Sequence, residues 1–176
     1  MIPGKDECIG MLREAGCSEG VVEHCIAVHQ TCMRISAHLR VEHSQELLTA
    51  GSLLHDIGRA FTHGIRHAVA GADYLRSLGV DPRVVLIVER HIGGGITPDE
   101  ARAVGLPVKD YTPKSIEEKV VCAADNITNH HVHPVEDTVR GFEEKGLHAA
   151  AERIVLLHEE ISELCSADIS LLQDVD

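Results

Sequence analysis

The sequence predicts an all-α fold, organised as a helical bundle in a single domain. Apolar residues recur at intervals of three and four in nearly every segment, and no segment alternates with the period of two of a half-buried strand. One apolar stripe consists of Val21, Cys25, Val28, Cys32, Ile35 and Leu39. Residues that favour helix N-termini precede several segments. They are Ser18, Ser44, Asp81 and Ser115.

The first half of the chain is divided into helices by caps and glycines. Gly16 ends a short first helix, and Ser18 begins a long second one. Ser44 begins a third helix, after which Gly58 and Gly64 bracket a loop. The predicted helices cover residues 6–15, 18–40, 44–57 and 67–77.

The second half continues the pattern. Asp81 and Pro82 are a cap and a first-turn proline, and they open a helix that the glycines at 93–95 end. Thr97 and Pro98 open a short helix that ends at Gly105. Ser115 and Glu118 have the spacing of a capping box. The remaining predicted helices cover residues 115–129, 134–145 and 147–164.

The composition of the chain limits which kinds of molecule it can bind and where in the cell we expect it. The chain has 176 residues, enough for one core, and its net charge is −12. This charge argues against binding to nucleic-acid phosphates, and four aromatic residues are too few for a base-stacking platform. Short apolar runs, the lack of a signal peptide at the N-terminus and six cysteines without a Cys-x-x-Cys pair predict a cytoplasmic protein with no membrane partner. Its oligomeric state stays open.

Histidine is the unusual residue, with thirteen copies. Four predicted helices each place a histidine or aspartate on the apolar side, three or four residues from a buried position. These side chains are His24, His55 with Asp56, His91 and Asp125. Taken singly, such a histidine is more often a hydrogen-bonded core residue than a metal ligand, and such an aspartate can simply cap a neighbouring group. Jointly they predict a metal site, because burying unpaired charges is costly.

The order His24, His55-Asp56 and Asp125 resembles the H…HD…D signature of the HD-domain superfamily. The string His55-Asp56-Ile57-Gly58-Arg59 is similar to the HDIG form of that signature, and a small archaeal-type HDIG group looks closest. The resemblance covers about residues 18–130, so we expect the helices of 134–176 to pack on this motif core. It implies an all-α, metal-dependent phosphohydrolase.

The resemblance also implies a set of metal ligands. One metal would take His24, His55, Asp56 and Asp125. His67, in a His-x-x-x-Gly element, and His91 resemble the ligands of a second metal that Asp56 would share. We expect one or two divalent ions, with Fe or Mn favoured and Zn and Co as alternatives. The second position is predicted to be weaker, because His67 adjoins a loop and His91 adjoins three glycines.

Candidate substrate-binding residues stand beside the motif positions. Arg59, Arg66 and Arg90 offer guanidinium groups for a phosphate, or are solvated surface charges. Gly94 would let a substrate approach the backbone, or it only ends a helix. His63 is a candidate acid, and with Asp56 and Arg59 it completes the predicted catalytic set.

Two other acid–base features are interpreted as structural. The three histidines that follow Asp125 are taken as a loop end with a minor chance of site contact. They are His130, His131 and His133. Glu118 is interpreted as the acid of its capping box.

The leading hypothesis is hydrolysis of a small phosphate ester, nucleotide-like or cyclic, by a metal-bound hydroxide. The chain departs from two branches of the superfamily. Glycines stand where cyclic-dinucleotide phosphodiesterases have a His-His pair and Gly-Tyr-Pro, and Arg59 to Phe61 replace the acidic pair of guanosine-tetraphosphate hydrolases. A di-iron oxygenase and a non-catalytic ligand-binding module remain as alternatives.

Overall fold

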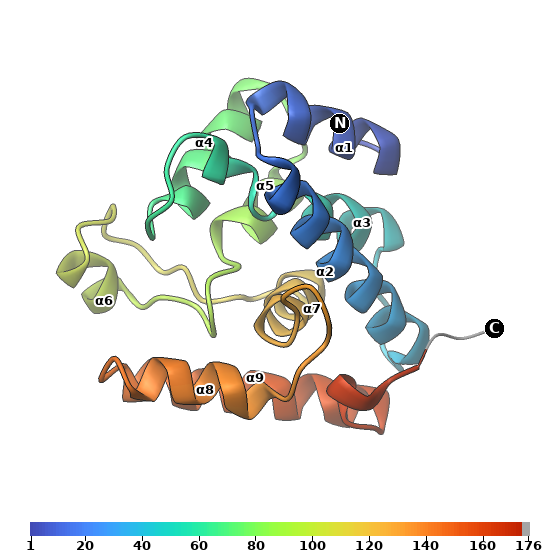
Figure 1. Ribbon diagram of the computed structural model, residues 1–176, viewed down its shortest axis with the longest axis vertical. Coiled ribbons are helices and arrows are strands. Elements are labelled where there is room, and N and C mark those ends of the chain that lie inside the picture. Colours follow the sequence, from blue (N-terminus) through green and yellow to red (C-terminus); the bar gives the residue numbers. More distant parts are fainter. Residues whose placement is uncertain (174–176) are drawn as a thin grey trace.

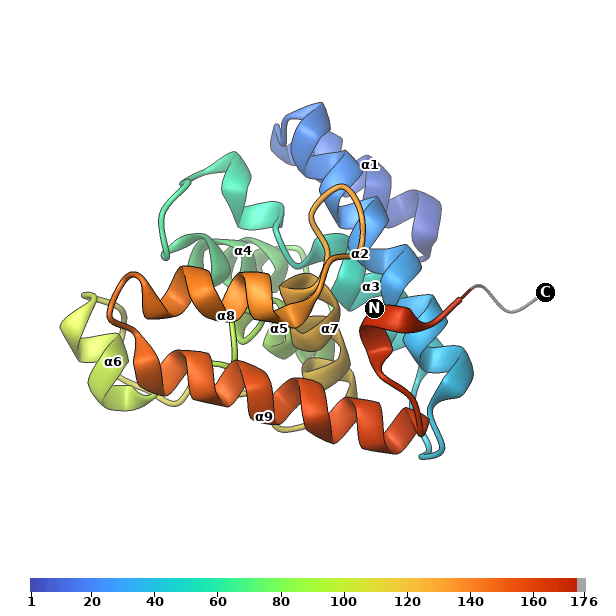
Figure 2. The same ribbon diagram turned by 60° about the horizontal axis from the view of Figure 1, so that its bottom comes forward.

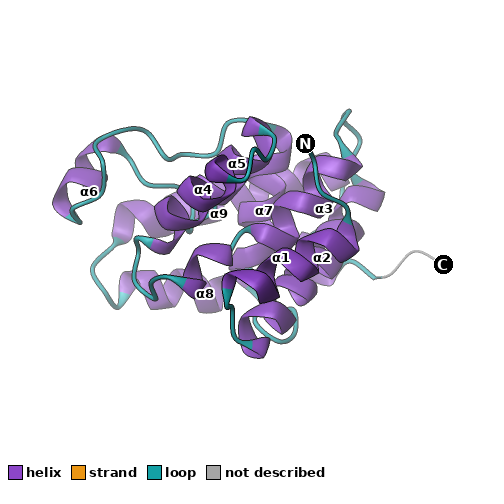
Figure 3. Cartoon of the chain, turned by 90° about the horizontal axis from the view of Figure 1, so that it is seen from above, coloured by secondary structure: helices purple, strands orange, loops and turns teal. Residues whose placement is uncertain are grey.

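The computed structural model describes residues 1–173. All the regular elements in that part of the chain are helical, which confirms the all-α prediction (Figure 3). The α-helices are α1 (Lys5–Ala15), α2 (Glu19–His38), α3 (Gln45–Leu54), α4 (His67–Ser77), α5 (Pro82–Glu89), α6 (Pro98–Ala103), α7 (Ile116–Asn126), α8 (Val135–Glu143) and α9 (His148–Cys165). Two 3₁₀ turns complete the elements, η1 (Ile57–Ala60) and η2 (Ile169–Leu171). Residues 174–176 of the predicted C-terminal segment lie outside the described part.

Helix α2 is the longest helix in the described part of the chain. It packs against both α3 and α7 (Figure 1). Helices α4 and α5 pack on each other beside it, and α8 lies along α9 (Figure 2). Helix α9 in turn packs on α7, as expected for the C-terminal helices. The core between these helices contains fully buried side chains such as Ile35, Leu48, Val88 and Val121. Since α7 contacts α2, α3, α5 and α9, it brings its last turn to the centre of the molecule.

The predicted caps begin their helices as expected. Backbone N–H groups donate to the side chains of Ser18, Ser44, Asp81 and Ser115 at the starts of α2, α3, α5 and α7. Gly16 ends α1 in the left-handed conformation, with φ of 93°. Thr97 and Glu100 form a reciprocal capping box at α6 that the sequence pattern had not singled out.

Two predicted helices are shorter in the structure. Helix α3 was expected to reach Ile57 but ends at Leu54, where the chain tightens into η1. The glycine after Ile57 explains this change, because the η1 backbone at Gly58 lies directly against the start of α4. Helix α7 was expected to reach residue 129 but ends at Asn126, whose carbonyl accepts a hydrogen bond from Thr138. In both cases a tertiary contact ends the helix before its local sequence would.

A buried histidine joins α2 to α3 and gives the fold a pH dependence. His29 shares a hydrogen bond of 3.1 Å with Ser52, and burial, with a smaller effect of Lys5, lowers the pKa of His29 to about 4. The unfolded chain therefore takes up this proton first as the pH falls below about 6.5. We expect the free energy of unfolding to fall between pH 6.5 and 4, with up to about 3 kcal/mol of the loss due to His29.

Urea unfolding of wild type and His29→Gln across this range measures the effect. The variant lacks the titrating group, so its stability should fall less steeply. Parallel curves for the two proteins would show that His29 titrates normally.

No helix among the described residues is long and apolar enough to cross a membrane.

Candidate metal centre

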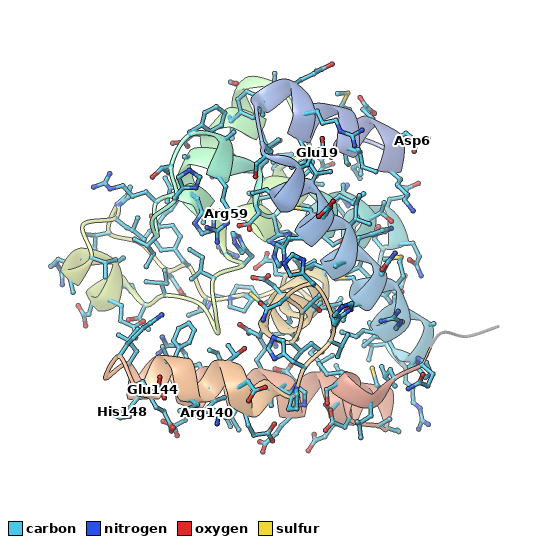
Figure 4. All side chains as sticks on the ribbon, in the orientation of Figure 1. Asp6, Glu19, Arg59, Arg140, Glu144 and His148 are labelled. Atoms are coloured by element: carbon cyan, nitrogen blue, oxygen red, sulfur yellow. The ribbon has the colours of Figure 1, made fainter. Side chains whose placement is uncertain are left out.

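Six histidine and aspartate side chains from five segments meet at the centre of the bundle. They are His24 of α2, His55 and Asp56 at the turn between α3 and η1, His67 at the start of α4, His91 just after α5, and Asp125 in the last turn of α7. Figure 4 shows Arg59 in this central region, whereas the labelled Asp6, Glu19 and His148 lie at the periphery. The structure therefore brings together all six residues for which the sequence predicted metal binding.

Four of these side chains surround a first position. The Nε2 atoms of His24 and His55 are 3.3 Å apart, and they lie 3.1 and 3.5 Å from Asp125 Oδ1. Both Nε2 atoms lie 3.8 Å from Asp56 Oδ2.

The other oxygen of Asp56 faces a second position. His67 Nε2 lies 3.0 Å and His91 Nε2 3.5 Å from Asp56 Oδ1, and the two nitrogens are 3.0 Å apart. Asp56 Oδ1 is buried and accepts no hydrogen bond in the described part of the chain. The two oxygens of one carboxylate thus point to two different pairs of imidazoles, as a bridging ligand requires.

The backbone sets the tautomer of all four imidazoles. In each ring Nδ1 faces a carbonyl oxygen, which can only accept, so Nδ1 carries the hydrogen and Nε2 carries the lone pair. The carbonyl groups belong to Asn129 for His24, Ser52 for His55, Gly64 for His67 and Val88 for His91, at 3.4, 2.7, 2.8 and 2.7 Å. In the neutral ring, Nε2 is therefore the nitrogen that each histidine can offer to a metal at the centre.

This donor arrangement fits metal ions. Ligand atoms about 2.1 Å from a shared ion lie about 3.0–3.4 Å apart at octahedral or tetrahedral angles. Most of the separations in both positions fall close to this range. A buried carboxylate oxygen without a hydrogen bond is costly unless a cation lies beside it, and Asp56 Oδ1 is such an atom.

The protonation states also suit metal binding. Burial would raise the pKa of Asp56 and of Asp125, but the neighbouring imidazoles outweigh it and hold both pKa values well below the ordinary value. Burial lowers the pKa of His91. Burial also lowers the pKa of His55, but nearby Cys25, Asp125 and Asp56 outweigh it and raise that pKa well above the ordinary value. The carboxylates are therefore ionised, as metal binding requires, and a metal bound by His55 would displace a proton from it.

The two histidines of the second position are held more firmly than their sequence context suggested, while weaker metal binding at that position stays a prediction. His67 and His91 are buried, with exposed fractions of 5% and 2%, and each ring is held by its carbonyl partner. His24 and Asp125 are the more open ligands, with side-chain exposed fractions of 23% and 22%. The sequence context of a loop and three glycines failed to predict this, because α4 and α7 cover those segments in the fold.

A pocket of about 290 Å³, which we call the polar pocket, opens over the centre and is lined by His24 and Asp125 of the first position and by His67 and His91 of the second. Beyond metal ligands, it is lined by Arg59, Ile92, Gly93, Asn126, Thr128, Asn129, His133, Thr138 and Phe142. Of these, Arg59 was predicted, and His133 was noted only as part of a loop-end cluster. The polar residues after Asp125 escaped detection because no periodic pattern marks an irregular loop.

Among the predicted substrate-binding residues, Arg59 lies at the site. Its Nε donates to Asp56 Oδ2 at 2.5 Å, and its side chain is 33% exposed toward the pocket. Arg66 instead donates to the carbonyl of Gly105, and the predicted acid His63 is an exposed loop residue that does not line the pocket.

Arg90, Gly94 and Glu118 have structural partners. Arg90 forms an ion pair of 3.0 Å with Glu118, which also accepts from the backbone of Lys114. Glu118 therefore pairs with an arginine of another helix instead of returning to Ser115 as a capping-box acid. A Cβ at Gly94 would lie 2.7 Å from Arg153 Cβ, so this glycine permits close packing against α9 rather than access to a substrate.

Comparison with known proteins gives one family and several relatives. The family model described as HD domain matches residues 21–130. A tRNA (cytidine(56)-2'-O)-methyltransferase of Picrophilus torridus is 43% identical over 169 residues, which are 96% of this chain and 49% of that protein. The uncharacterized protein MJ0778 of Methanocaldococcus jannaschii is 47% identical over 84% of this chain and 91% of its own length.

A more distant similarity is to a Ribonuclease Y of Frankia casuarinae, 35% identical over 52% of this chain and 14% of that protein. The chain spans about half the length of the methyltransferases that it matches. No solved structure matches it.

Proposed function

The chain belongs to the HD-domain family, and from this membership and the geometry of its centre we propose that it is a metal-dependent phosphohydrolase. Its substrate is a small phosphomonoester or phosphodiester, nucleotide-like or cyclic. The family supports metal-dependent hydrolysis in general, and the pocket of about 290 Å³ supports a small substrate.

The observation that carries the proposal is the bridging position of Asp56, whose two oxygens face the Nε2 atoms of two different pairs of histidines. Two divalent ions held in this way polarise a phosphoryl group and lower the pKa of a coordinated water. The nitrogen and oxygen donors suit Fe and Mn, and also Co and Zn, whereas no thiolate is required.

The protein's own residues would bind and orient the phosphate. The Arg59 guanidinium fixes the bridging carboxylate through Nε, so its other N–H groups are available to a phosphate oxygen in the pocket. His133 lines the same pocket, and its Nδ1 contacts the carbonyl of Pro134 at 3.0 Å, which leaves Nε2 for the substrate. We assign His133, in place of His63, as the general acid: in its imidazolium form it would donate the Nε2 proton to the leaving oxygen and become the neutral ring with its hydrogen on Nδ1.

We do not propose methyltransferase activity for this chain, although two of its relatives are named as methyltransferases. The similar region accounts for about half of each of those proteins, while MJ0778 is covered almost completely. We infer that methyl transfer belongs to the other half of the larger proteins.

This inference predicts that the purified chain transfers no methyl group from radiolabelled S-adenosylmethionine to tRNA, with the Picrophilus torridus protein as the positive control. Methylation of tRNA by this chain alone would overturn it.

One panel experiment tests the hydrolase proposal. The protein is purified, its metal content is measured, and phosphate release is followed from phosphomonoesters, phosphodiesters and cyclic phosphates with added Mn or Fe. Oxygen consumption is recorded in parallel. Turnover that depends on oxygen would support the oxygenase alternative, and absence of bound metal together with absence of turnover would support a non-catalytic module.

The second metal position is tested by His91→Ala. The position has two histidines and the shared Asp56, so losing one histidine leaves too few protein ligands. We expect the Mn content to fall from two ions per chain to one, and the rate to fall about 100-fold, or about 2.7 kcal/mol. Metal analysis and steady-state kinetics measure both effects.

His148→Ala is the matched control, because His148 is exposed at the start of α9. It should keep wild-type metal content and rate. Full metal content and full rate in His91→Ala would leave only a single-metal mechanism.

A further inference from the structure

A second cavity, of about 170 Å³, adjoins the polar pocket over the metal centre. Its walls are mainly apolar and come from the loop before α4, the segment from Ile92 through α6, and the α8–α9 region. The apolar wall residues that matter here are Ile65, Ile92, Ile96, Val104, Phe142 and Leu147. We call this cavity the apolar pocket.

The apolar pocket lies next to the polar pocket and shares part of its wall. Ile92 and Phe142 line both cavities. Between them the backbone at Gly93 packs on the Phe142 ring, where an added Cβ would lie 3.1 Å from the ring edge. A molecule held at the metal centre would therefore have the apolar pocket as its neighbour.

The pocket is open rather than filled by the protein. Three of its wall residues, Ile65, Val104 and Leu147, are among the few large apolar side chains that are exposed. At its polar edge, Arg153 pairs with Glu100 at 2.7 Å and donates to the carbonyl of Gly95. Apolar walls with a few fixed polar groups are typical of a small-molecule site.

We infer that the apolar pocket is a second subsite, which takes the planar ring of the phosphate ester whose phosphate lies at the metal centre. This inference rests on the proposed function. A cavity of about 150 Å³ lined by apolar side chains holds one aromatic ring, so the apolar pocket is of suitable size. The walls of the apolar pocket are almost wholly apolar, so they suit the face of a planar ring rather than a charged or hydroxylated group.

Leu147→Asp is the variant that tests the subsite. Leu147 is the residue before α9, where aspartate is favoured as a cap, so the helix should form while a charge enters the wall. Leu156→Asp makes the same change at an exposed position of the same helix outside the pocket. Ala103→Phe, at an exposed position of the pocket wall, fills the space without adding charge.

The kinetic measurement compares nucleoside 5′-monophosphates with ribose 5-phosphate, which lacks the ring. For the Mn-loaded wild type we expect at least one nucleotide to have a kcat/KM at least tenfold higher than that of ribose 5-phosphate, mainly through KM. Leu147→Asp and Ala103→Phe should reduce this ratio toward one, and Leu156→Asp should keep it. An unchanged ratio in both pocket variants would overturn the subsite.

A binding measurement separates the subsite from the hydrolase proposal. Adenosine, guanosine, cytidine and uridine carry no phosphate, and their binding is followed by the methyl resonances of Ile65, Ile96 and Leu147 in labelled protein. Shifts without any phosphate release would keep the subsite and reject the hydrolase. No shift with any nucleoside would overturn the subsite. A changed oligomeric state of Leu147→Asp as the only effect would also overturn it, and would identify the pocket as a protein-docking surface.

Discussion

Asp56→Ala is expected to remove most of the bound metal and to lower phosphohydrolase activity at least about 1,000-fold. Asp56 is the residue that faces both metal positions, with one oxygen toward each pair of histidines. Its loss takes a negative ligand from both ions at once and leaves Arg59 without its carboxylate partner. A 1,000-fold loss corresponds to about 4 kcal/mol of transition-state stabilisation. Metal analysis of the purified variant and kinetics with added Mn or Fe measure the two effects.

Asp73→Ala is the matched control for this substitution. Asp73 is an exposed aspartate of α4 that pairs only with Arg76, a contact of little energetic weight. It should retain metal and activity. Two metal ions per chain and an unchanged rate in Asp56→Ala would show that the bridge is not part of the mechanism.

Gly58→Ala is expected to destabilise the fold strongly, by about 3 kcal/mol or more. A Cβ at this position would lie 1.9 Å from the carbonyl oxygen of His67 and 2.6 Å from the backbone nitrogen of Gly71. Neither atom belongs to a flexible side chain, so η1 and α4 must move apart. Because His67 begins α4 and is a predicted metal ligand, the same movement should also weaken the second metal position. Thermal unfolding and metal content measure the result.

Gly64→Ala provides the comparison within the same connection. An added Cβ there meets no atom within 4 Å, and the carbonyl that accepts from His67 is kept. We expect its stability to stay within about 0.5 kcal/mol of the wild type. Equal stability of the two variants would mean that η1 and α4 can move apart at little cost in the free energy of unfolding.

The sequence predicted the features that local chemistry determines. Helix starts at Ser18, Ser44 and Ser115 follow from side-chain oxygens that accept backbone N–H groups, which needs no knowledge of the fold. The convergence of His24 and Asp125 was predictable for a related reason. Ligand-type side chains on the apolar side of their helices must find partners in the core.

Features that depend on contacts between distant segments were not predictable in the same way. The end of α3 is set by Gly58 against α4, and the role of Glu118 is set by Arg90 on a different helix. Arg59 and Arg90 were both predicted to bind substrate, with Arg59 preferred because it follows the HDIG-like string, yet one reaches the bridging carboxylate and the other a structural glutamate. The arginine side chain is long enough to reach several carboxylates, so its partner depends on which carboxylate the fold places nearest.

The distribution of metal ligands along the chain bears on how the protein is held together. His24 and Asp125, whose side chains meet at 3.1 Å, are 101 residues apart. An ion held by both closes a loop of that length, as a covalent cross-link between α2 and α7 would. Closing a loop of about 100 residues lowers the entropy of the unfolded chain and raises its free energy by several kcal/mol. The six cysteines are free, so this tie is made without a disulfide in the described part of the chain. The metal centre would thus act as a reversible cross-link, whose contribution to the free energy of unfolding rises and falls with the concentration of free metal.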